Sequence, residues 1–145
     1  MAAIKRKGDS VWNGSGKDGK GVLNTESGAV SDLGYSTSKR FGEERGTNPE
    51  ELLAIAHAGC FNMALAFGLS GKGSPPEELR TTAVVSMEQQ GTDYTITKID
   101  LQLRGRVPGM SAEDFRQAAE QAKAGCPVSK LFKGAEITLD AQLDQ

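Results

Sequence analysis

The sequence predicts a single α+β domain over residues 1–145, with a largely antiparallel sheet covered on one face by helices. One long apolar helix is expected over residues 48–69. Expected strands precede this helix, segments with alternating apolar residues, typical of strands, follow it, and a second helix separates the last two strands. A chain of 145 residues is long enough for one domain with one hydrophobic core.

The N-terminal region is expected to form a β-hairpin and then a short strand. The first strand of the hairpin covers residues 10–13. The region between its two strands is rich in glycine, with Gly14, Gly16, Gly19 and Gly21. Glycine accepts the positive φ angles that such turns need. After a polar loop, a short strand is expected over residues 35–41.

The long helix is expected to begin at Asn48 and to end near Gly71. Asn48 is a favourable N-cap, Pro49 is tolerated in the first turn, and the carboxylate of Glu50 suits the positive end of the helix dipole. Apolar residues then cover most of the circumference up to about Leu69. A helix that is apolar nearly all round is expected to be buried nearly all round, under a sheet on one side and against another helix on the other.

The C-terminal half is expected to contain three strands and a second helix. Three segments alternate apolar and polar residues, as strands do: 81–89, 94–107 and 135–143. In the second of them the apolar residues change from even to odd positions, which predicts a β-bulge near residues 97–98. Ser111 is the expected cap of a helix that ends near Ala124, and residues 128–132 add a short helical turn.

The charge distribution argues against several classes of protein. The net charge is −2 and both signs are mixed along the chain, so no basic stripe indicates nucleic acid and no polybasic helix indicates a membrane surface. The N-terminus has no apolar run typical of a secretory signal, and no stretch is expected to reach the ~18–20 apolar residues of a membrane span. We therefore expect a cytoplasmic protein, in which thiols stay reduced unless they are catalytic or act as sensors.

The composition also bears on oligomeric state. Apolar residues make up 37% of the chain and aromatic residues 6%, which is lean for a monomer with one very apolar helix. Burial of that helix against a second copy of the chain would account for both features, so we expect a homodimer.

Two cysteines are the first candidates for chemistry. Cys126 precedes Pro127, and a residue before proline is disfavoured in the helical region. If Pro127 begins a helix, Cys126 is its N-cap and its thiolate is stabilised there; alternatively, the segment is only a turn. Cys60 lies in the middle of the long helix, where a lone cysteine is more often core than nucleophile. It would need a polar or cationic neighbour, because apolar burial raises a thiol pKa.

Two charged residues could provide such a neighbour. Glu50 precedes Cys60 by ten residues, about 15 Å along one helix, so it could reach only a Cys60 presented by a second subunit. Otherwise it simply completes the first helical turn. An arginine that faces a thiol stabilises the thiolate, and Arg40 is the candidate, although most exposed arginines are merely solvated. Lys39 and Arg45 compete for this role.

His57, one turn before Cys60, could act as a base or a metal ligand. One histidine and two cysteines are one ligand short of a structural zinc site, and their spacing fits no zinc motif. We therefore expect a packed or interface histidine and no structural zinc site.

Residues 46–65 and 122–132 resemble the two cysteine motifs of the OsmC/Ohr family of osmotically inducible and organic hydroperoxide resistance proteins. Other segments resemble its OsmC branch: 21–28, 40–53, 95–103 and 135–143. The resemblance implies an OsmC-like fold in an intertwined homodimer, with long central helices packed between two sheets and active sites at the subunit interface. It also implies a thiol peroxidase that needs no metal, haem or flavin.

By the same resemblance, Cys60 matches the peroxidatic cysteine, Cys126 the resolving cysteine, and Glu50 the active-site carboxylate. The arginine of the OsmC branch corresponds to Arg40. In the Ohr branch the arginine lies in an N-terminal glycine-rich loop, but residues 14–21 here contain lysines and no arginine.

The resulting hypothesis is a peroxidase that reduces organic hydroperoxides, and hydrogen peroxide less well. It would act through a Cys60 sulfenic acid and a Cys60–Cys126 disulfide, which an external dithiol, of lipoyl type in some family members, would reduce. Two alternatives remain: a non-catalytic redox sensor that uses the same disulfide, and a stress-induced binding module with inert thiols.

Overall fold

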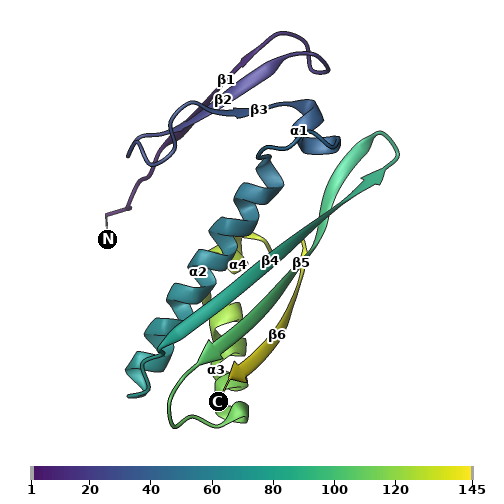
Figure 1. Ribbon diagram of the computed structural model, residues 1–145. Helices are drawn as coiled ribbons and strands as arrows, with labels where there is room; N and C mark the ends of the chain where they lie inside the picture. Colours follow the sequence, from purple (N-terminus) through teal and green to yellow (C-terminus); the bar gives the residue numbers. More distant parts are fainter. Residues whose placement is uncertain (1, 145) are drawn as a thin grey trace. The chain divides into compact units, whose positions relative to one another are not determined.

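The computed structural model describes residues 2–144 and divides into two compact units, one up to Pro49 and one from Glu50 onward. Each unit contains a three-stranded sheet, and the long helix α2 begins where the units meet in the sequence (Figure 1). Strands and helices in this order make an α+β fold, as the sequence predicts.

The N-terminal unit is a small antiparallel sheet followed by one short helix. The sheet has the order β1–β2–β3, and its elements are β1 (Gly8–Asn13), β2 (Lys20–Thr25), β3 (Leu33–Tyr35) and α1 (Thr37–Phe41). The predicted hairpin is confirmed, but the strand expected over residues 35–41 is wrong beyond Tyr35. Ser36 caps a helix there, because its Oγ accepts a hydrogen bond from the Lys39 amide at 3.3 Å.

The glycines of the hairpin serve two purposes. Gly14 has a φ of 100°, the left-handed conformation that glycine accepts readily. Gly21 instead allows close packing, since an added Cβ would lie 2.4 Å from Cε1 of Tyr35 and 2.7 Å from Cε3 of Trp12. These two rings pack with their centroids 5.3 Å apart, and they need the space that Gly21 leaves.

The C-terminal unit packs helices against one sheet of order β4–β5–β6. Its elements are α2 (Pro49–Gly71), β4 (Glu78–Gln90), β5 (Asp93–Arg106), α3 (Ala112–Gly125), α4 (Pro127–Leu131) and β6 (Glu136–Asp144). β4 pairs with β5 in antiparallel orientation, whereas β5 and β6 are parallel. The sheets are therefore largely antiparallel, as predicted, with one parallel pairing that the sequence did not predict. The α3–α4 segment provides the crossover that a parallel pair requires.

The predicted bulge lies where the apolar parity of β5 changes. Ser86 pairs with Lys98 and the next residue, Met87, pairs with Ile96, so Thr97 is the extra residue on β5. From there on, the odd-numbered residues of β5 face the core.

The core of this unit lies between the sheet and the two longer helices, which cover the same face of the sheet (Figure 1). α2 contributes Phe61, Leu65 and Leu69, which are 0% exposed. The other fully buried large apolar side chains come from β5 and α3: Ile99, Leu101, Leu103 and Phe115.

Only one face of α2 is buried within the chain. On the opposite face, Ile55 and Met63 are each 64% exposed and Phe67 is 75% exposed. Gly59 continues this stripe, and a Cβ added there would meet no atom of the described residues within 4 Å. The expectation that the helix is buried nearly all round is therefore wrong for a single chain, because no element of the described residues packs on this face.

The composition of α2 overturns a second expectation. The helix is long and apolar enough to cross a membrane by length and composition, with a mean hydropathy of 1.7 over a window that is 22% buried. A core helix that packs on both faces has the same composition. The expectation that no stretch has the length and composition of a membrane span is therefore wrong for this helix.

Candidate active site

The two cysteines, 66 residues apart in the sequence, lie in contact in the structure. The Cys126 thiol donates a hydrogen bond to the Cys60 sulfur, with 2.9 Å between the two Sγ atoms. Both thiols are free. A disulfide bond is about 2.05 Å long, so the sulfurs need to move by less than 1 Å to form one.

Each sulfur is held by regular secondary structure. Cys60 projects from the middle of α2 and is partly exposed. Cys126 is 0% exposed and joins two helices, since its amide donates to the Ala122 carbonyl of α3 and its carbonyl accepts from the Lys130 amide of α4. It is the N-cap of α4 and Pro127 is the first residue, which is one of the two alternatives that the sequence left open, but among the described residues its side chain makes no capping hydrogen bond.

The surroundings of Cys60 favour its protonated form. Burial raises the pKa of the Cys60 thiol above its ordinary value, and the hydrogen bond and charge of Cys126 raise it further. Only a backbone hydrogen bond from Val128, in the first turn of α4, acts in the opposite direction. The N-terminus of α4, which was expected to stabilise the thiolate of Cys126, thus stabilises the thiolate of Cys60. A reactive thiolate at neutral pH requires a further positive group.

His57 and Ser129 form a buried pair beside the sulfurs. His57 is 0% exposed, and its Nε2 lies 2.7 Å from Ser129 Oγ, the side chain of which is also buried. The His57 ring packs edge-on against Phe132, with centroids 5.5 Å apart. Burial lowers the pKa of His57, which keeps the imidazole neutral. The histidine is packed, as predicted. The sequence analysis did not single out Ser129, although it lies one turn after Cys126.

The structure does not bring Glu50 to the Cys60 of its own chain. Glu50 lies in the first turn of α2, and the helix separates the two residues by about 15 Å of axial rise. Arg40 belongs to α1 of the N-terminal unit, where its exposed guanidinium lies 5.0 Å from the centroid of the Phe41 ring. Among the described residues, no group of three His, Cys, Asp or Glu side chains could hold a metal ion.

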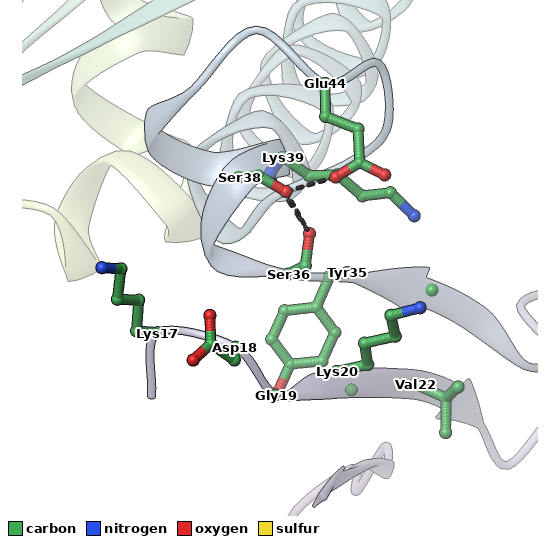
Figure 2. Close-up of a pocket in the computed structure, with 12 residues that line it drawn as sticks. Lys17, Asp18, Gly19, Lys20, Val22, Tyr35, Ser36, Ser38, Lys39 and Glu44 are labelled. Carbon is green, nitrogen blue, oxygen red and sulfur yellow. Dashed lines mark hydrogen bonds between the residues drawn. The ribbon is translucent and has the colours of Figure 1, made fainter. Parts of the chain in front are cut away.

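The short helix that carries Arg40 is fixed by a hydrogen-bond network on the wall of a cavity of about 480 Å³. Figure 2 shows Ser38 between two partners: it is 3.2 Å from the Ser36 hydroxyl and donates to the Glu44 carboxylate. Lys17, Lys20 and Lys39 also line this cavity, but neither cysteine does. The hydrogen-bond network on its wall orders the segment around Arg40.

The family match and the similar proteins of known name agree on one family. The family described as "OsmC-like protein" matches residues 42–141. The chain is 48% identical over 140 residues to Peroxiredoxin OsmC of Escherichia coli strain K12, which covers 97% of both chains. It is 32% identical over 136 residues to organic hydroperoxide resistance protein-like 2 of Staphylococcus epidermidis, covering 92% of this chain and 90% of that protein.

Solved structures share the fold at lower identity. The crystal structure of an OsmC-like protein from Mycoplasma pneumoniae superimposes with a TM-score of 0.79 at 15% identity, covering 99% of this chain and 100% of that one.

Proposed function

The chain belongs to the OsmC-like protein family, and on that basis we propose that it is a thiol-dependent peroxidase that reduces organic hydroperoxides, and hydrogen peroxide less well. The observation that carries the proposal is the contact between the Cys60 and Cys126 sulfurs at 2.9 Å. One relative is named a peroxiredoxin and another an organic hydroperoxide resistance protein, and two thiols in contact are suited to that chemistry.

The proposed reaction has three steps. The Cys60 thiolate attacks the hydroperoxide; an S–O bond forms, the O–O bond breaks, and the alkoxide takes up a proton and leaves as an alcohol. Cys126 then attacks the sulfur of the resulting sulfenic acid, which forms the Cys60–Cys126 disulfide and releases water. An external dithiol, of lipoyl type in our proposal, reduces this disulfide by thiol–disulfide exchange.

Arg40 and Glu50 complete the proposed site. The pKa of Cys60 is raised by burial, so the thiolate needs a cation that the sulfur pair itself lacks. We assign this role to the Arg40 guanidinium, which would also hold a peroxide oxygen, and we assign to Glu50 the task of orienting that guanidinium. Since Glu50 is too far along α2 to reach its own Cys60, the proposal places these groups at a Cys60 of another subunit.

A homodimer is the second part of the proposal. The exposed stripe of Ile55, Met63 and Phe67 on α2 is a continuous apolar face on the helix that carries Cys60. A second copy of α2 packed on this face would bury it, and Gly59 would allow the two helices to approach closely. We also propose a cytoplasmic location, where an intracellular dithiol would keep both thiols reduced between turnovers.

The proposed function is tested by titrating the reduced protein with cumene hydroperoxide and counting free thiols. We expect two thiols to be lost per chain, with a Cys60–Cys126 disulfide in the peptide map. Turnover with a dithiol such as dihydrolipoamide should then follow, whereas a redox sensor would be oxidised once and stop. If micromolar peroxide left both thiols unreacted, the chain would keep the family fold without the peroxidase activity.

The dimer and Arg40 are tested by two variants. Phe67→Glu should produce a monomer in light scattering, because dimer formation would bury an unpaired carboxylate.

Arg40→Met should remain dimeric but raise the pH midpoint for alkylation of Cys60, since a nearby cation shifts a pKa by about 1–3 units. Its reaction with peroxide near neutral pH should be roughly tenfold slower or more.

Lys39→Met is the matched control, because it removes the neighbouring cation of the same helix and should leave the alkylation midpoint unchanged. An unchanged midpoint in Arg40→Met would exclude Arg40 from the site, and a monomeric wild-type protein would exclude the dimer.

A further inference from the structure

The two helices that carry the cysteines are joined by a second buried contact besides the sulfur pair. His57 of α2 and Ser129 of α4 are 0% and 6% exposed, and they share a hydrogen bond of 2.7 Å. Phe132, the C-cap of α4, packs on the edge of the same imidazole. His57 therefore contacts α4 at two positions, Ser129 and the C-cap Phe132. These two contacts hold α4 against α2.

The contact lies one helical turn from each sulfur. His57 precedes Cys60 by three residues on α2, and Ser129 follows Cys126 by three residues at the start of α4. Residues three apart lie next to one another on one face of a helix. A movement of α4 that broke the His57–Ser129 hydrogen bond would therefore carry Cys126 away from Cys60.

The sulfur pair cannot hold itself together throughout the reaction. The hydrogen bond between the Cys126 thiol and the Cys60 sulfur belongs to the reduced protein. We expect it to be lost when Cys60 becomes a sulfenic acid, because the oxidised sulfur is a poorer acceptor than a thiolate. α4 has only five residues, and a helix of that length is not stable without tertiary contacts. After the first chemical step, the resolving cysteine thus depends on other contacts to remain in place.

We propose that the His57–Ser129 hydrogen bond positions Cys126 for attack on the Cys60 sulfenic acid, so that both are positioning residues for the resolving step. The inference rests on the proposed function. In this step the Cys126 sulfur forms a bond to the Cys60 sulfur and the S–O bond of the sulfenic acid breaks. The oxygen leaves as water with the proton that Cys126 gives up, and no other reactant is needed.

The chemistry of the pair supports a role beyond packing. Among the residues that the structure describes, His57 Nδ1 has no hydrogen-bond partner, so either tautomer leaves one buried ring nitrogen unsatisfied. An unsatisfied buried polar group costs stability, and an apolar side chain at this position would avoid that cost. What the imidazole provides, and a leucine would not, is a directional bond to Ser129.

The test separates positioning from stability by removing both partners together. Loss of one partner leaves the other unsatisfied, whereas replacing both with apolar side chains is close to neutral for folding. The double variant His57→Leu/Ser129→Ala is therefore expected to fold, with a thermal unfolding temperature close to that of the wild type. His57→Gln, which keeps a donor and an acceptor near the position of Nε2, is the conservative variant.

The measured quantity is the lifetime of the sulfenic acid in a single turnover. Reduced protein is mixed with one equivalent of cumene hydroperoxide and quenched with dimedone, which traps sulfenic acid, and the disulfide is measured in parallel. We expect disulfide formation in the double variant to be roughly tenfold slower, because the free energy of one well-placed buried hydrogen bond corresponds to about that change in rate. Sulfinic acid at Cys60 should increase with peroxide concentration, and His57→Gln should restore part of the rate.

Thr81→Val is the matched control. It removes a hydrogen bond of 2.6 Å between Thr81 Oγ1 and Asn62 Oδ1, which joins the same helix α2 to β4 instead of α4. Its sulfenic acid should have the wild-type lifetime. A folded double variant that forms the disulfide at the wild-type rate would overturn the inference, as would an equal delay in Thr81→Val. Failure of the proposed function is recognised separately, because the wild-type protein would then form no sulfenic acid at all.

Discussion

Cys60→Ser is expected to abolish peroxide reduction. A serine hydroxyl stays protonated at neutral pH and lacks the polarisable sulfur that attacks an O–O bond, so turnover should fall by roughly three orders of magnitude or more. The fold should persist, because Cys60 is partly exposed and the substitution changes little volume. Steady-state consumption of cumene hydroperoxide with a dithiol measures the effect, and the thermal unfolding temperature provides the control.

The same variant distinguishes the two sulfurs. Cys126 should remain reduced when Cys60→Ser is mixed with peroxide, because it is 0% exposed and has no access to the substrate. Peroxidase activity retained in Cys60→Ser would show that Cys60 is not the peroxidatic residue. Rapid oxidation of Cys126 in that variant would reverse the two roles.

Cys126→Ser is expected to allow one round of chemistry and then to stop. Cys60 should still be oxidised, but no intramolecular thiol is left to resolve the sulfenic acid. Turnover with an external dithiol should fall by roughly a hundredfold. A positioned intramolecular thiol reacts faster than one from solution by more than this factor, so the estimate uses only a small part of that rate advantage. With excess peroxide, Cys60 should proceed to sulfinic acid, which mass spectrometry of its peptide identifies.

The two cysteine variants should also differ in their first turnover. Cys126→Ser should consume close to one equivalent of peroxide before it stops, whereas Cys60→Ser should consume none. Undiminished steady-state turnover of Cys126→Ser would mean that the external dithiol reduces the sulfenic acid directly, and the disulfide would then lie outside the catalytic cycle.

Several parts of the fold could be predicted because their signals are local. The change of apolar parity in β5 placed the bulge at Thr97, since strand side chains alternate faces and one extra residue shifts that alternation. Pro127 after Cys126 left two alternatives, a helix that begins at Pro127 or only a turn, because proline restricts the residue before it; the structure has the helix. The strand expected over residues 35–41 was wrong because the cap formed by Ser36 outweighed strand propensity.

Such local signals predicted only part of the candidate site. Family resemblance, and not periodicity, paired Cys60 with Cys126. Ser129 was missed, because its meaning depends on His57, 72 residues away, and no local pattern joins the two positions. The exposed face of α2 was likewise not predictable, since its composition suits burial on both faces and gives no indication of which face the chain itself covers.

By itself, the sequence determined the kinds and the order of the elements apart from the short helix α1, the position of the bulge and the place of Cys60 in the long helix. These depend on residues within a few positions of one another, through capping, alternation and backbone restriction. Only the tertiary structure decided the parallel pairing of β6 with β5, the contact of the two sulfurs at 2.9 Å and the buried pair of His57 and Ser129. Those features join residues about 40 to 70 positions apart, which only packing around a shared core brings together.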